Sequence, residues 1–391
     1  MAWELEKVED QRFNLIQSYE VGIPMTDLCK IYGISRKTAY KWVNRYKEFG
    51  CEGLKDMSKA PLKPHQIYDD EVINLAIDMK LKYRKWGPKK ILAKLKRELP
   101  DHQWPCPTRL YEIYKSLHLV IPKRLRNKLP ATHPLSNVNE SNDVWMADFK
   151  GWALTRNREK CEPLTITDAH SRYLIRCDHM NRKTCDDVWL IMEDAFKEFG
   201  LPKRVRTDNG PPFGCMGIGR LTKLSINLIK SGVVPEWINP GHPEENGRHE
   251  RFHSTLKQEA MTPPSKNLKE QVRRMMEFQT QYNYERPHEA LNMGVPADYY
   301  CVSSRKWDGR LRSPEYDTQE CDVRKVCKSG CIWVKQKEYY ISQTLTGEYV
   351  ALKEGEYGRE LYYGPIYLGF LGADGRIDRP KLKKKNIVRR Q

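Results

Sequence analysis

Three acidic residues stand where their carboxylates could bind divalent metal ions. Asp148 follows a hydrophobic run, Asp208 follows the short run 204–207, and Glu250 lies in a segment with helical character. Hard cations such as Mg²⁺ and Mn²⁺ prefer carboxylate oxygens. Two such ions held about 4 Å apart can activate an attacking oxygen and stabilise a leaving oxygen in phosphoryl transfer. Carboxylates from two strands and a helix would be sufficient to hold such a pair.

Taken singly, each acid also has an ordinary structural explanation. The segment 208–210 has good turn chemistry, Glu250 could be a charge on a helix surface, and Asp148 could pair with Lys150. For any one acid alone, the structural explanation is the simpler one. A functional interpretation therefore depends on the motifs around the acids.

Five motifs follow one another in order along this part of the chain. They are Trp145-x-x-Asp148, Thr167-Asp168-Ala169-His170-Ser171-Arg172, Thr207-Asp208-Asn209-Gly210-Pro211-Pro212-Phe213, the segment 240–253 that ends in Asn246-Gly247-Arg248-His249-Glu250-Arg251-Phe252-His253, and Tyr282-Asn283-x-x-Arg286-Pro287-His288. Five motifs in order are hard to obtain by chance. Together they resemble the D-D-E transposases of bacterial insertion sequences, which are relatives of the retroviral integrases. The resemblance is strong over 144–300 and looser on either side.

The resemblance implies an RNase H-like core in which Asp148, Asp208 and Glu250 are the catalytic, metal-binding acids. The step from Asp208 to Glu250 is six positions longer than is typical of the family, and the typical spacing would select Glu244. We choose Glu250 because the family's glutamate follows a Gly-x-x turn and sits inside a helix. The surplus would then be an insertion in the glycine-containing loop 213–235, since surface loops tolerate changes in length.

The reaction is also implied by the resemblance, and it uses two divalent metal ions, Mg²⁺ or Mn²⁺. Water attacks a phosphodiester at the end of the mobile element, and the released 3′-hydroxyl then attacks target DNA. No covalent protein–DNA intermediate is needed, so a catalytic Ser or Tyr is not expected. Asp168 matches a family position other than the metal-binding one, and we expect it to have a hydrogen-bonding or turn role.

The implied partners are double-stranded DNA, both the terminal repeats of the element and the target, and further copies of the chain in a dimer or tetramer. Two other functions stay open. One is a DNA-binding regulator derived from a transposase, and the other is an RNase H-like nuclease without strand transfer. The complete set of carboxylates argues against the regulator, and paired N-terminal DNA-binding modules argue against a simple nuclease.

The residues around the acids predict an α/β core over 144–300. Strand-forming runs occupy 144–149, 164–167, 173–177 and 204–207, and a helix is expected over about 246–260. On that helix Ser254 and Lys257 lie at i+4 and i+7 from Glu250, so they share its face. Lys257 is placed to contact a phosphate beside the cleaved bond, with a solvated lysine as an equal alternative. Arg248 is a further candidate contact to DNA.

Residues 1–60 are predicted to form a helix-turn-helix DNA-binding domain. Ser35 is a good N-cap for its last helix. A core-facing stripe at i, i+3, i+4 and i+7 consists of Ala39, Trp42, Val43 and Tyr46. The opposite face carries Arg36, Lys37, Lys41 and Arg45. This is the pattern of a helix that enters the major groove, and the alternative is a plain three-helix core with solvated charges.

Residues 66–120 are predicted to form a second helical, helix-turn-helix-like DNA-binding domain, in which Pro88 and Pro107 mark helix starts. Residues 121–143 read as a basic linker, whose charges could follow a phosphate backbone or simply be solvated.

The C-terminal part is predicted to be a small antiparallel β-barrel over 320–371, followed by a basic tail over 376–391. The tail would attract phosphate without reading sequence. Cys321, Cys327 and Cys331 lie close together and could in principle bind zinc, but they lack an obvious fourth ligand, so ordinary half-buried cysteines are the better interpretation.

Composition agrees with a nucleic-acid partner. The 391 residues carry a formal net charge of +17 with a pI near 9.3, which favours an acidic polymer, and the 39% hydrophobic content can supply buried cores. Eleven cysteines without a C-x-x-C pair indicate reduced thiols. No apolar run is long enough for a membrane span. We therefore expect a cytoplasmic bacterial protein associated with the nucleoid.

Overall fold

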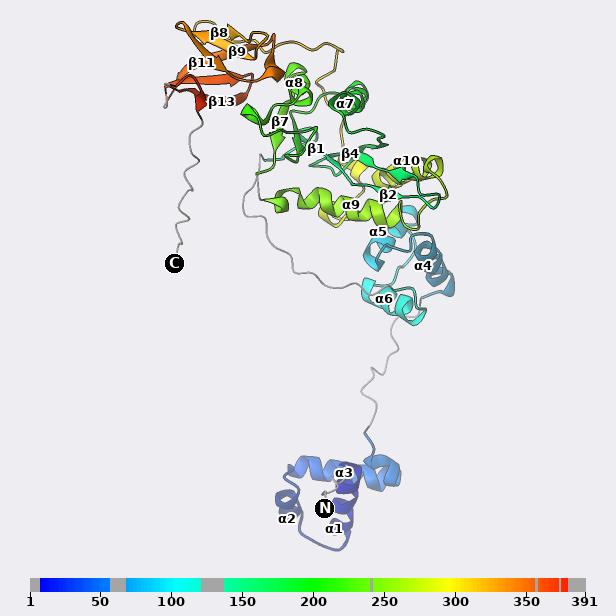
Figure 1. The fold of residues 1–391 in the computed structure, drawn as a ribbon. Coiled ribbons are helices and arrows are strands. Elements are labelled where there is room, and N and C mark those ends of the chain that lie inside the picture. Colours follow the sequence, from blue (N-terminus) through cyan, green and yellow to red (C-terminus); the bar gives the residue numbers. More distant parts are fainter. Residues whose placement is uncertain are drawn as a thin grey trace. The chain divides into compact units, whose positions relative to one another are not determined.

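The computed structural model describes residues 8–56, 68–120, 137–239, 242–355, 358–372 and 374–378 (Figure 1). The chain divides into two compact units, 1–67 and 68–391, each described here by itself. Most of the predicted linker (121–136) and of the basic tail (379–391) lie outside the described residues. None of the helices in the described ranges is long and apolar enough to cross a membrane.

The first unit consists of three α-helices and a short 3-10 turn. They are α1 (Val8–Glu20), α2 (Met25–Ile31), α3 (Arg36–Phe49) and η1 (Gly50–Leu54). Gly33, at φ +64°, makes the turn between α2 and α3. Ser35 is the predicted N-cap of α3, because its hydroxyl accepts the Thr38 N–H at 3.2 Å. The buried core includes Leu15, Leu28, Ala39, Trp42 and Val43, which confirms the predicted core-facing side of α3.

The second unit begins with three more helices, α4 (Asp70–Lys82), α5 (Pro88–Glu98) and α6 (Pro107–Ser116). A proline stands in the first turn of α5 and of α6, where a missing N–H costs no helical hydrogen bond. These helices bury their own core, which includes Trp86, Ile91, Leu95, Leu110 and Tyr114. Ion pairs join them to the region that follows the central sheet: Lys94 to Glu285 at 3.2 Å and Arg97 to Asp298 at 2.7 Å.

A five-stranded sheet forms the centre of the second unit. Its strands are β1 (Val144–Phe149), β4 (Pro163–Asp168), β5 (Leu174–His179), β6 (Arg204–Thr207) and β7 (Val234–Trp237), and their order is β5-β4-β1-β6-β7. β1 pairs antiparallel with β4 and parallel with β6, and β6 pairs parallel with β7. A two-stranded ribbon, β2 (Ala153–Leu154) with β3 (Lys160–Cys161), projects between β1 and β4. The predicted strands are confirmed.

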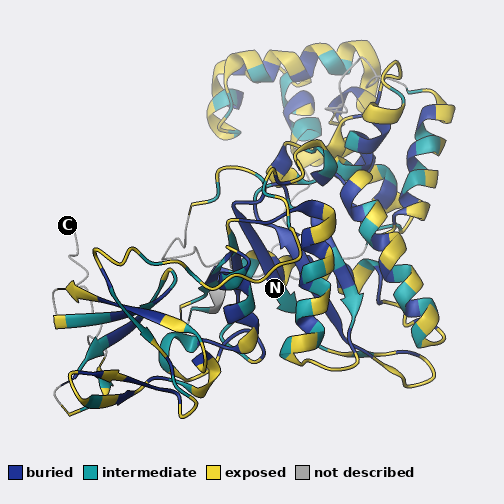
Figure 2. Cartoon of the chain, turned by 90° about the horizontal axis from the view of Figure 1, so that it is seen from above, coloured by how far each residue is buried: buried dark blue, intermediate teal, exposed yellow. Residues whose placement is uncertain are grey.

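Helices cover both faces of this sheet. They are α7 (Cys185–Phe199), α8 (Lys223–Lys230), α9 (Gly247–Glu259) and α10 (Leu268–Tyr284). Alternate residues of β1 and β4, such as Trp145 and Ile166, pack with Phe196 of α7, whereas Phe252 of α9 packs with α10. Figure 1 shows α7 and α9 on opposite sides of the strands, and Figure 2 shows the strands buried between them. Short 3-10 turns η2 (Ile218–Arg220), η3 (Pro243–Asn246), η4 (Glu289–Leu291) and η5 (Pro296–Asp298) lie in the loops.

The C-terminal part contains an open sheet, and the closed barrel predicted for 320–371 is not found in the described residues. Strands β8 (Asp322–Lys325), β11 (Tyr349–Gly355), β12 (Gly358–Tyr363), β13 (Ile366–Leu371) and β14 (Ile377–Asp378) pair in the order β14-β13-β12-β11-β8. A separate hairpin is formed by β9 (Cys331–Val334) and β10 (Lys337–Tyr340), and η6 (Gln343–Leu345) follows it.

The physical reason for the open sheet is that its apolar face is covered from outside. Ile332 and Tyr339 of the hairpin, together with Ile226 and Ile229 of α8, join the sheet residues in one buried cluster. An alternating pattern requires only that one face of each strand be buried. A covering hairpin and helix meet that requirement without pairing β14 to β8.

Candidate active site

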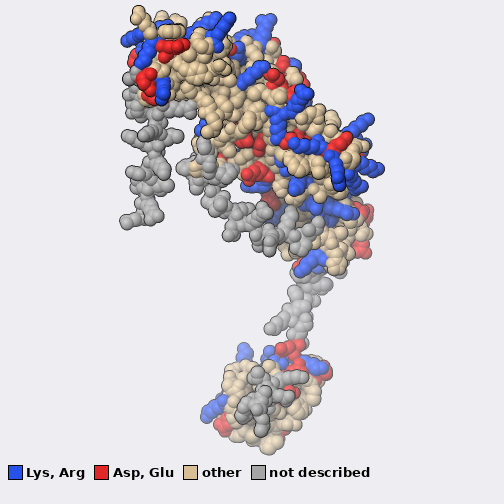
Figure 3. All heavy atoms as spheres, in the orientation of Figure 1, with Lys and Arg blue, Asp and Glu red and all other residues tan. Residues whose placement is uncertain are grey.

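The sheet brings two of the three candidate acids to the same edge. Asp148 lies near the end of β1, and Asp208 directly follows β6. These strands are parallel neighbours with Met146 opposite Arg206, so the same register leads to Asp148 and Asp208 two residues further on. Glu250 lies in the first turn of α9, and its side chain is exposed. Figure 3 shows Asp and Glu side chains grouped over the region of α9.

Asp208 and Glu250 both lie near enough to Asp148 for their charges to act on its carboxyl group. Burial raises the pKa of Asp148 to about 6, and the charges of Asp208 and Glu250 raise it further against a lowering hydrogen bond from Asn246. Burial also raises the pKa of Asp208, while the Gly210 N–H and Lys183 act in the opposite direction. The charges of Asp208 and Glu250 oppose the ionisation of Asp148, and a divalent cation would relieve that repulsion, although the three acids do not place their oxygens within 4.8 Å of one another among the described residues.

The loop before α9 is held by amide–carboxylate contacts. The Asn246 amide donates to Asp148 Oδ2 at 2.9 Å, so the start of α9 is tied directly to the first acid. Glu245 is buried and accepts the backbone and side-chain N–H groups of Asn239, both at 2.7 Å. Glu245 therefore closes the loop. The side chain of Glu244 lies outside the described residues.

Two buried histidines, which the sequence analysis did not select, lie beneath Asp148. The Thr165 hydroxyl donates to the backbone carbonyl of Asp148 at 3.0 Å. Nε2 of His249 and Nε2 of His253 lie 2.7 and 2.8 Å from the same hydroxyl oxygen. Because a hydroxyl has one proton, both imidazoles donate Nε2–H to Thr165. The signal in the sequence was their i, i+4 spacing on either side of Glu250, which puts both rings on one face of α9.

The two imidazoles are neutral. Burial lowers the pKa of His249 to about 3 and that of His253 to about 2, and the His253 pKa is lowered further by His249 and Lys150. Nδ1 of His253 lies 4.0 Å from Asp148 Oδ2, and Asp148, His249 and His253 offer ligand atoms within 4.8 Å of one another. The two imidazoles therefore support the backbone of Asp148 through Thr165 without adding a positive charge beside its carboxylate.

Two lysines border the carboxylates. The pKa of Lys150 is lowered by burial and then by the charge of Lys257, and Asp148 acts to raise it, so Lys150 lies near both the acid and Lys257. Lys257 is exposed on α9. On the Asp208 side, Lys183 forms an ion pair with Glu162 and lies 4.7 Å from the centre of the Phe149 ring.

The other polar residues of the motifs have structural partners. Asp168 is buried and accepts the Asn142 N–H at 2.8 Å and the Ser171 N–H and hydroxyl at 2.7 and 2.6 Å, which confirms its expected hydrogen-bonding role. Arg286 pairs with Glu259 at 3.0 Å, and both side chains are largely buried.

The predicted DNA contacts fall in separate places. Arg36, Lys37 and Lys41 are exposed on α3 of the first unit. Arg45 instead lies over the Trp42 ring at 4.7 Å and donates to the Lys55 carbonyl at 2.9 Å.

The C-terminal cysteines are only partly brought together. Cys327 and Cys331 gather with Glu338, and their ligand atoms lie within 4.8 Å of one another. Cys321 is not part of this group. A zinc site made of the three cysteines, the weak alternative raised above, does not form in the described residues.

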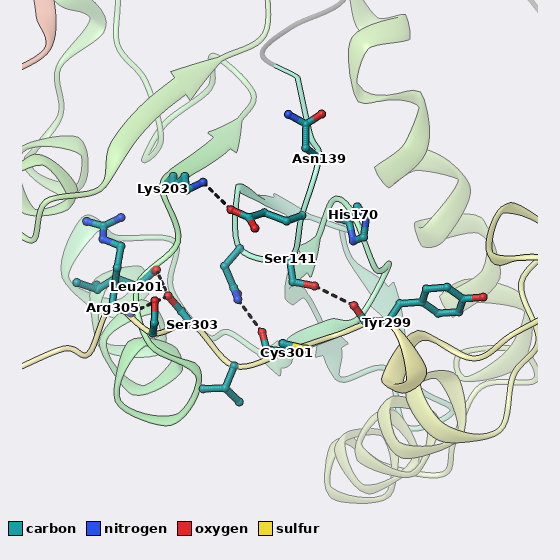
Figure 4. Close-up of a pocket in the computed structure, with 13 residues that line it drawn as sticks. Asn139, Ser141, His170, Leu201, Lys203, Tyr299, Cys301, Ser303 and Arg305 are labelled. Atoms are coloured by element: carbon teal, nitrogen blue, oxygen red, sulfur yellow. Dashed lines mark hydrogen bonds and ion pairs between the residues drawn. The ribbon is translucent and has the colours of Figure 1, made fainter.

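A hollow of about 420 Å³ lies away from the acids (Figure 4). It is lined by the segment before β1 and by the segment after α10, among other residues. Ser141 and Asn142 donate across it to the carbonyls of Tyr299 and Cys301, at 2.9 and 2.7 Å. None of the candidate acids lines it. Its contacts fix the start of β1, which carries Asp148.

Domain comparisons recognise two kinds of domain in the chain. One model of an integrase core domain matches residues 138–243, and a second model of an integrase core domain matches residues 231–296. A homeodomain-like domain matches residues 6–55 and, by a second description, 38–114.

Several relatives come from bacterial mobile elements. The chain is 24% identical over 286 residues to a 31.7 kDa protein of insertion element IS407 from Burkholderia multivorans, covering 72% of this chain and 91% of that protein. It is 26% identical over 229 residues to a 39.2 kDa protein of insertion element IS476 from Xanthomonas euvesicatoria, covering 57% and 62%. It is 25% identical over 287 residues to the transposase for transposon Tn552 from Staphylococcus aureus, covering 64% and 56%. The chain thus spans less than two thirds of the last two proteins.

Solved structures show more distant similarity. A chain of the simian T-cell lymphotropic virus intasome shares 13% identity with a TM-score of 0.38, covering 75% of this chain and 99% of that one. The catalytic core of HTLV-2 integrase, in complex with magnesium, shares 14% identity with a TM-score of 0.32, covering 41% and 97%.

Proposed function

We propose that this chain, which belongs with the DDE transposases of bacterial insertion sequences, cleaves the 3′ ends of its mobile element and joins them to target DNA. The observation that carries the proposal is the convergence of Asp148 and Asp208 at the ends of two parallel strands, with Glu250 close enough to raise the pKa of Asp148. DNA transposition is the general activity of such proteins, and the two chemical steps are the finer proposal.

Asp148, Asp208 and Glu250 are the residues that would hold Mg²⁺ or Mn²⁺. Two divalent ions would supply activation of the attacking oxygen and stabilisation of the leaving oxygen. The chain itself positions the carboxylates. Pairing of β1 with β6 sets the first two, and the hydrogen bond from Asn246 to Asp148 sets the start of α9, which carries the third.

Thr165, His249 and His253 are positioning residues in this proposal. The Thr165 hydroxyl donates to the backbone carbonyl of Asp148 and accepts hydrogen bonds from His249 and His253, so the three residues fix the position of this backbone. Since the imidazoles are neutral, they add no charge that would compete with a cation for Asp148.

DNA would be held by parts of the chain outside the carboxylates. Arg36, Lys37 and Lys41 present exposed charges on α3, the helix proposed to enter the major groove of the terminal repeats. Lys257 shares the face of Glu250 and would contact a phosphate near the cleaved bond. Joining two ends requires a homo-oligomer on DNA, which is part of the proposal.

The proposal is tested with labelled DNA that carries the terminal repeats of the element, in the presence of Mn²⁺ or Mg²⁺. Asp148→Asn, Asp208→Asn and Glu250→Gln should each abolish cleavage and strand transfer while end binding in gel shifts is kept. Asp194→Asn, an exposed acid on α7, is the matched control and should remain active. Retained cleavage by any of the three variants would remove that residue from the site.

The choice between Glu250 and Glu244 has its own comparison in the same assay. Glu244→Gln should cleave, because the family's glutamate follows a Gly-x-x turn inside a helix, and Glu250 stands in that position in the first turn of α9. If Glu244→Gln were inactive and Glu250→Gln active, Glu244 would be the third catalytic acid, as the typical family spacing implies. Cleavage without joining would favour the nuclease, and binding without either step would favour the regulator.

A further inference from the structure

A second cavity, of about 470 Å³, lies on α9 away from the carboxylates. Five cationic residues line it: Lys90 of α5, Arg172 after β4, Arg248 and Arg251 of α9, and Arg286 after α10. The acid in its lining is Glu289, which is exposed. The cavity therefore has a strong excess of positive charge, and it is built from elements far apart in the sequence.

Among the described residues, three of these guanidinium groups lack an ion-pair partner. Arg286 is neutralised by Glu259 at 3.0 Å. Within the described ranges, Arg172, Arg248 and Arg251 form no ion pair. Burial and then the charges of Arg248 and Arg251 lower the pKa of Arg172, against opposing effects of Tyr282 and Asp168. Burial, then Arg206 and Arg251, lower the pKa of Arg248. Like charges held together in this way favour an anion between them.

The backbone turn at Arg172 fixes where its side chain begins. Arg172 has φ +67°, in the left-handed region that non-glycine residues seldom occupy. The turn is maintained by Asp168, whose carbonyl accepts the Arg172 N–H at 3.0 Å and whose carboxylate accepts from Ser171. The buried Asp168 motif thus fixes the point from which Arg172 reaches the cavity.

Helix α9 links this cavity to the catalytic acids. At about 100° per residue, Arg248, Arg251 and Thr255 share one side of the helix, whereas Glu250 and Lys257 lie on the opposite side. An α-helix with side chains is about 10 Å across. An anion in the cavity would therefore sit across α9 from the reacting phosphate, within reach of the same piece of nucleic acid.

A neighbouring cavity of about 600 Å³ continues the basic surface onto α5 and α6. It shares Lys90, Arg286 and Glu289 with the first and adds Lys85 and Lys89. The N-terminal ends of α5 and α6, at Pro88 and Pro107, also line it. Backbone N–H groups at helix starts favour phosphate, and the shared lining residues would let the two cavities act as one track for an anionic strand.

We propose that the arginine cavity binds a backbone phosphate of DNA, and that the track along α5 and α6 holds the strand that leads away from it. Forked guanidinium groups suit the oxygens of a phosphodiester. The inference rests on the proposed function, since it takes DNA as the ligand. It adds that two regions of the chain bind the same DNA backbone. Lys90 contributes from the second helical region, and Arg172, Arg248 and Arg251 contribute from the catalytic core.

The test measures DNA affinity against salt concentration, with a chelator present so that no metal-dependent chemistry contributes. The full-length double variant Arg248→Gln/Arg251→Gln is compared with the wild type and with Arg273→Gln, an exposed arginine on α10 that pairs with Glu277. Each lost phosphate contact should reduce the slope of log K against log salt by about 0.9. We expect a reduction of about one to two units in the double variant and no change in the control.

Two DNA arms separate the possible sources of the phosphate. One is a duplex that ends in the cleaved terminal repeat, and the other is a target duplex without the repeat. A reduced slope on one arm identifies which DNA occupies the cavity. An unchanged slope on both arms overturns the inference.

A second measurement uses the wild-type chain, so it does not depend on the variant folding. Phenylglyoxal modifies accessible arginines, and peptide mass spectrometry locates the adducts. DNA should protect Arg172, Arg248 and Arg251 but leave Arg273 reactive; equal reactivity with and without DNA overturns the inference. Neither measurement involves cleavage. A negative result here would therefore overturn the phosphate site but not the proposed role of the carboxylates, and loss of the carboxylate proposal would not affect the phosphate site.

Discussion

At the scale of single residues, the surroundings of Asp148 oppose its negative charge. It is partly buried, the charges of Asp208 and Glu250 act on it, and its carboxylate accepts a hydrogen bond from the neutral amide of Asn246. The folded protein therefore holds the Asp148 proton more tightly than the unfolded chain does. Without a metal ion, an ionised Asp148 therefore lowers the free energy of unfolding. Shifted pKa values of this kind are common at functional sites.

This conflict predicts how stability depends on pH in the absence of metal. The folded pKa of about 6 lies above the ordinary value of 3.8 for an aspartate. The contribution of Asp148 to the free energy of unfolding is therefore fully present below about pH 4 and is lost as pH rises through 6. Asp148→Asn should remove this loss and stabilise the metal-free protein at pH 8 by at most about 3 kcal/mol. Thermal melts from pH 4 to 8 measure it.

Divalent metal provides the control for that prediction. Mn²⁺ should raise the melting temperature of the wild type, since a ligand that binds only the folded state stabilises it. Asp148→Asn should respond much less. If the variant melts below the wild type at pH 8 without metal, the electrostatic account of Asp148 is wrong.

Thr165 leads to a second prediction at this scale. Thr165→Val keeps the shape but leaves Nε2–H of His249 and of His253 without their shared acceptor in a buried place. We expect a loss of about 1–3 kcal/mol in the free energy of unfolding and slower cleavage. Thr165→Ser should restore both. Chemical denaturation and single-turnover cleavage measure the two effects, and an unchanged cleavage rate in the valine variant would limit Thr165 to a purely structural role.

At the scale of elements, α3 and α9 show how one helix can present different chemistry on different sides. α3 buries Ala39, Trp42 and Val43, and its charged residues point outward. Lys41 and Arg45 both lie over the Trp42 ring, at 5.2 and 4.7 Å, but Arg45 also donates to the Lys55 carbonyl and is only partly exposed, so it is less available to DNA than Lys41. The basic face predicted from the sequence is therefore divided into a packing part and an exposed part.

The corresponding prediction concerns binding of the terminal repeats by α3. Arg36→Ala and Lys41→Ala should weaken end binding, whereas Arg45→Ala should mainly lower the stability of the first unit. Loss of a phosphate contact reduces the salt slope by about one unit, and loss of a base contact costs about 1 to 3 kcal/mol at one sequence position. Salt titrations on matched and mismatched repeats distinguish these roles. Unchanged affinity in both Arg36→Ala and Lys41→Ala would mean that this face does not contact DNA.

At the scale of the second unit as a whole, the catalytic core is joined to its neighbours on both sides. Lys94 and Arg97 of α5 pair with Glu285 and Asp298. On the other side, Lys230 of α8 pairs with Glu348 at 2.7 Å, beside the apolar cluster that α8 shares with the C-terminal sheet. The sheet that holds the acids is thus supported by regions that supply no acid to the site.

This architecture refines the expected role of the C-terminal region. Removing residues 379–391, a lysine- and arginine-rich tail, should weaken DNA binding modestly and more so at low salt, where screening is least. Removing everything after 320 should impair pairing of two ends more than binding of one, and it should also lower the melting temperature because Ile226 and Ile229 lose their cover. Native gels of one-end and two-end complexes, with melts of each variant, separate these effects. If the shorter chain pairs ends as well as the full chain does, the C-terminal region has no part in assembly.

Local patterns in the sequence determined much of this protein. The strands that carry Asp148 and Asp208, the helix that carries Glu250, the Ser35 cap and the core side of α3 all depend on residues close together in the chain, so period and capping predict them. The predicted turn role of Asp168 is confirmed for the same reason, since its partner Ser171 is three residues away. The domain boundaries and the assignment of catalytic and DNA-binding residues remain predictions.

Only the tertiary structure decided which distant residues meet. Thr165 of β4 joins His249 and His253 of α9 through hydrogen bonds that span more than eighty positions, and Arg172 meets Arg248 and Arg251 from another part of the chain. The closed barrel was predicted wrongly for the same physical reason. Alternation specifies that one face of each strand is buried, but whether a strand pairs with the far edge or is covered by a hairpin and α8 depends on long-range packing, which no local pattern records.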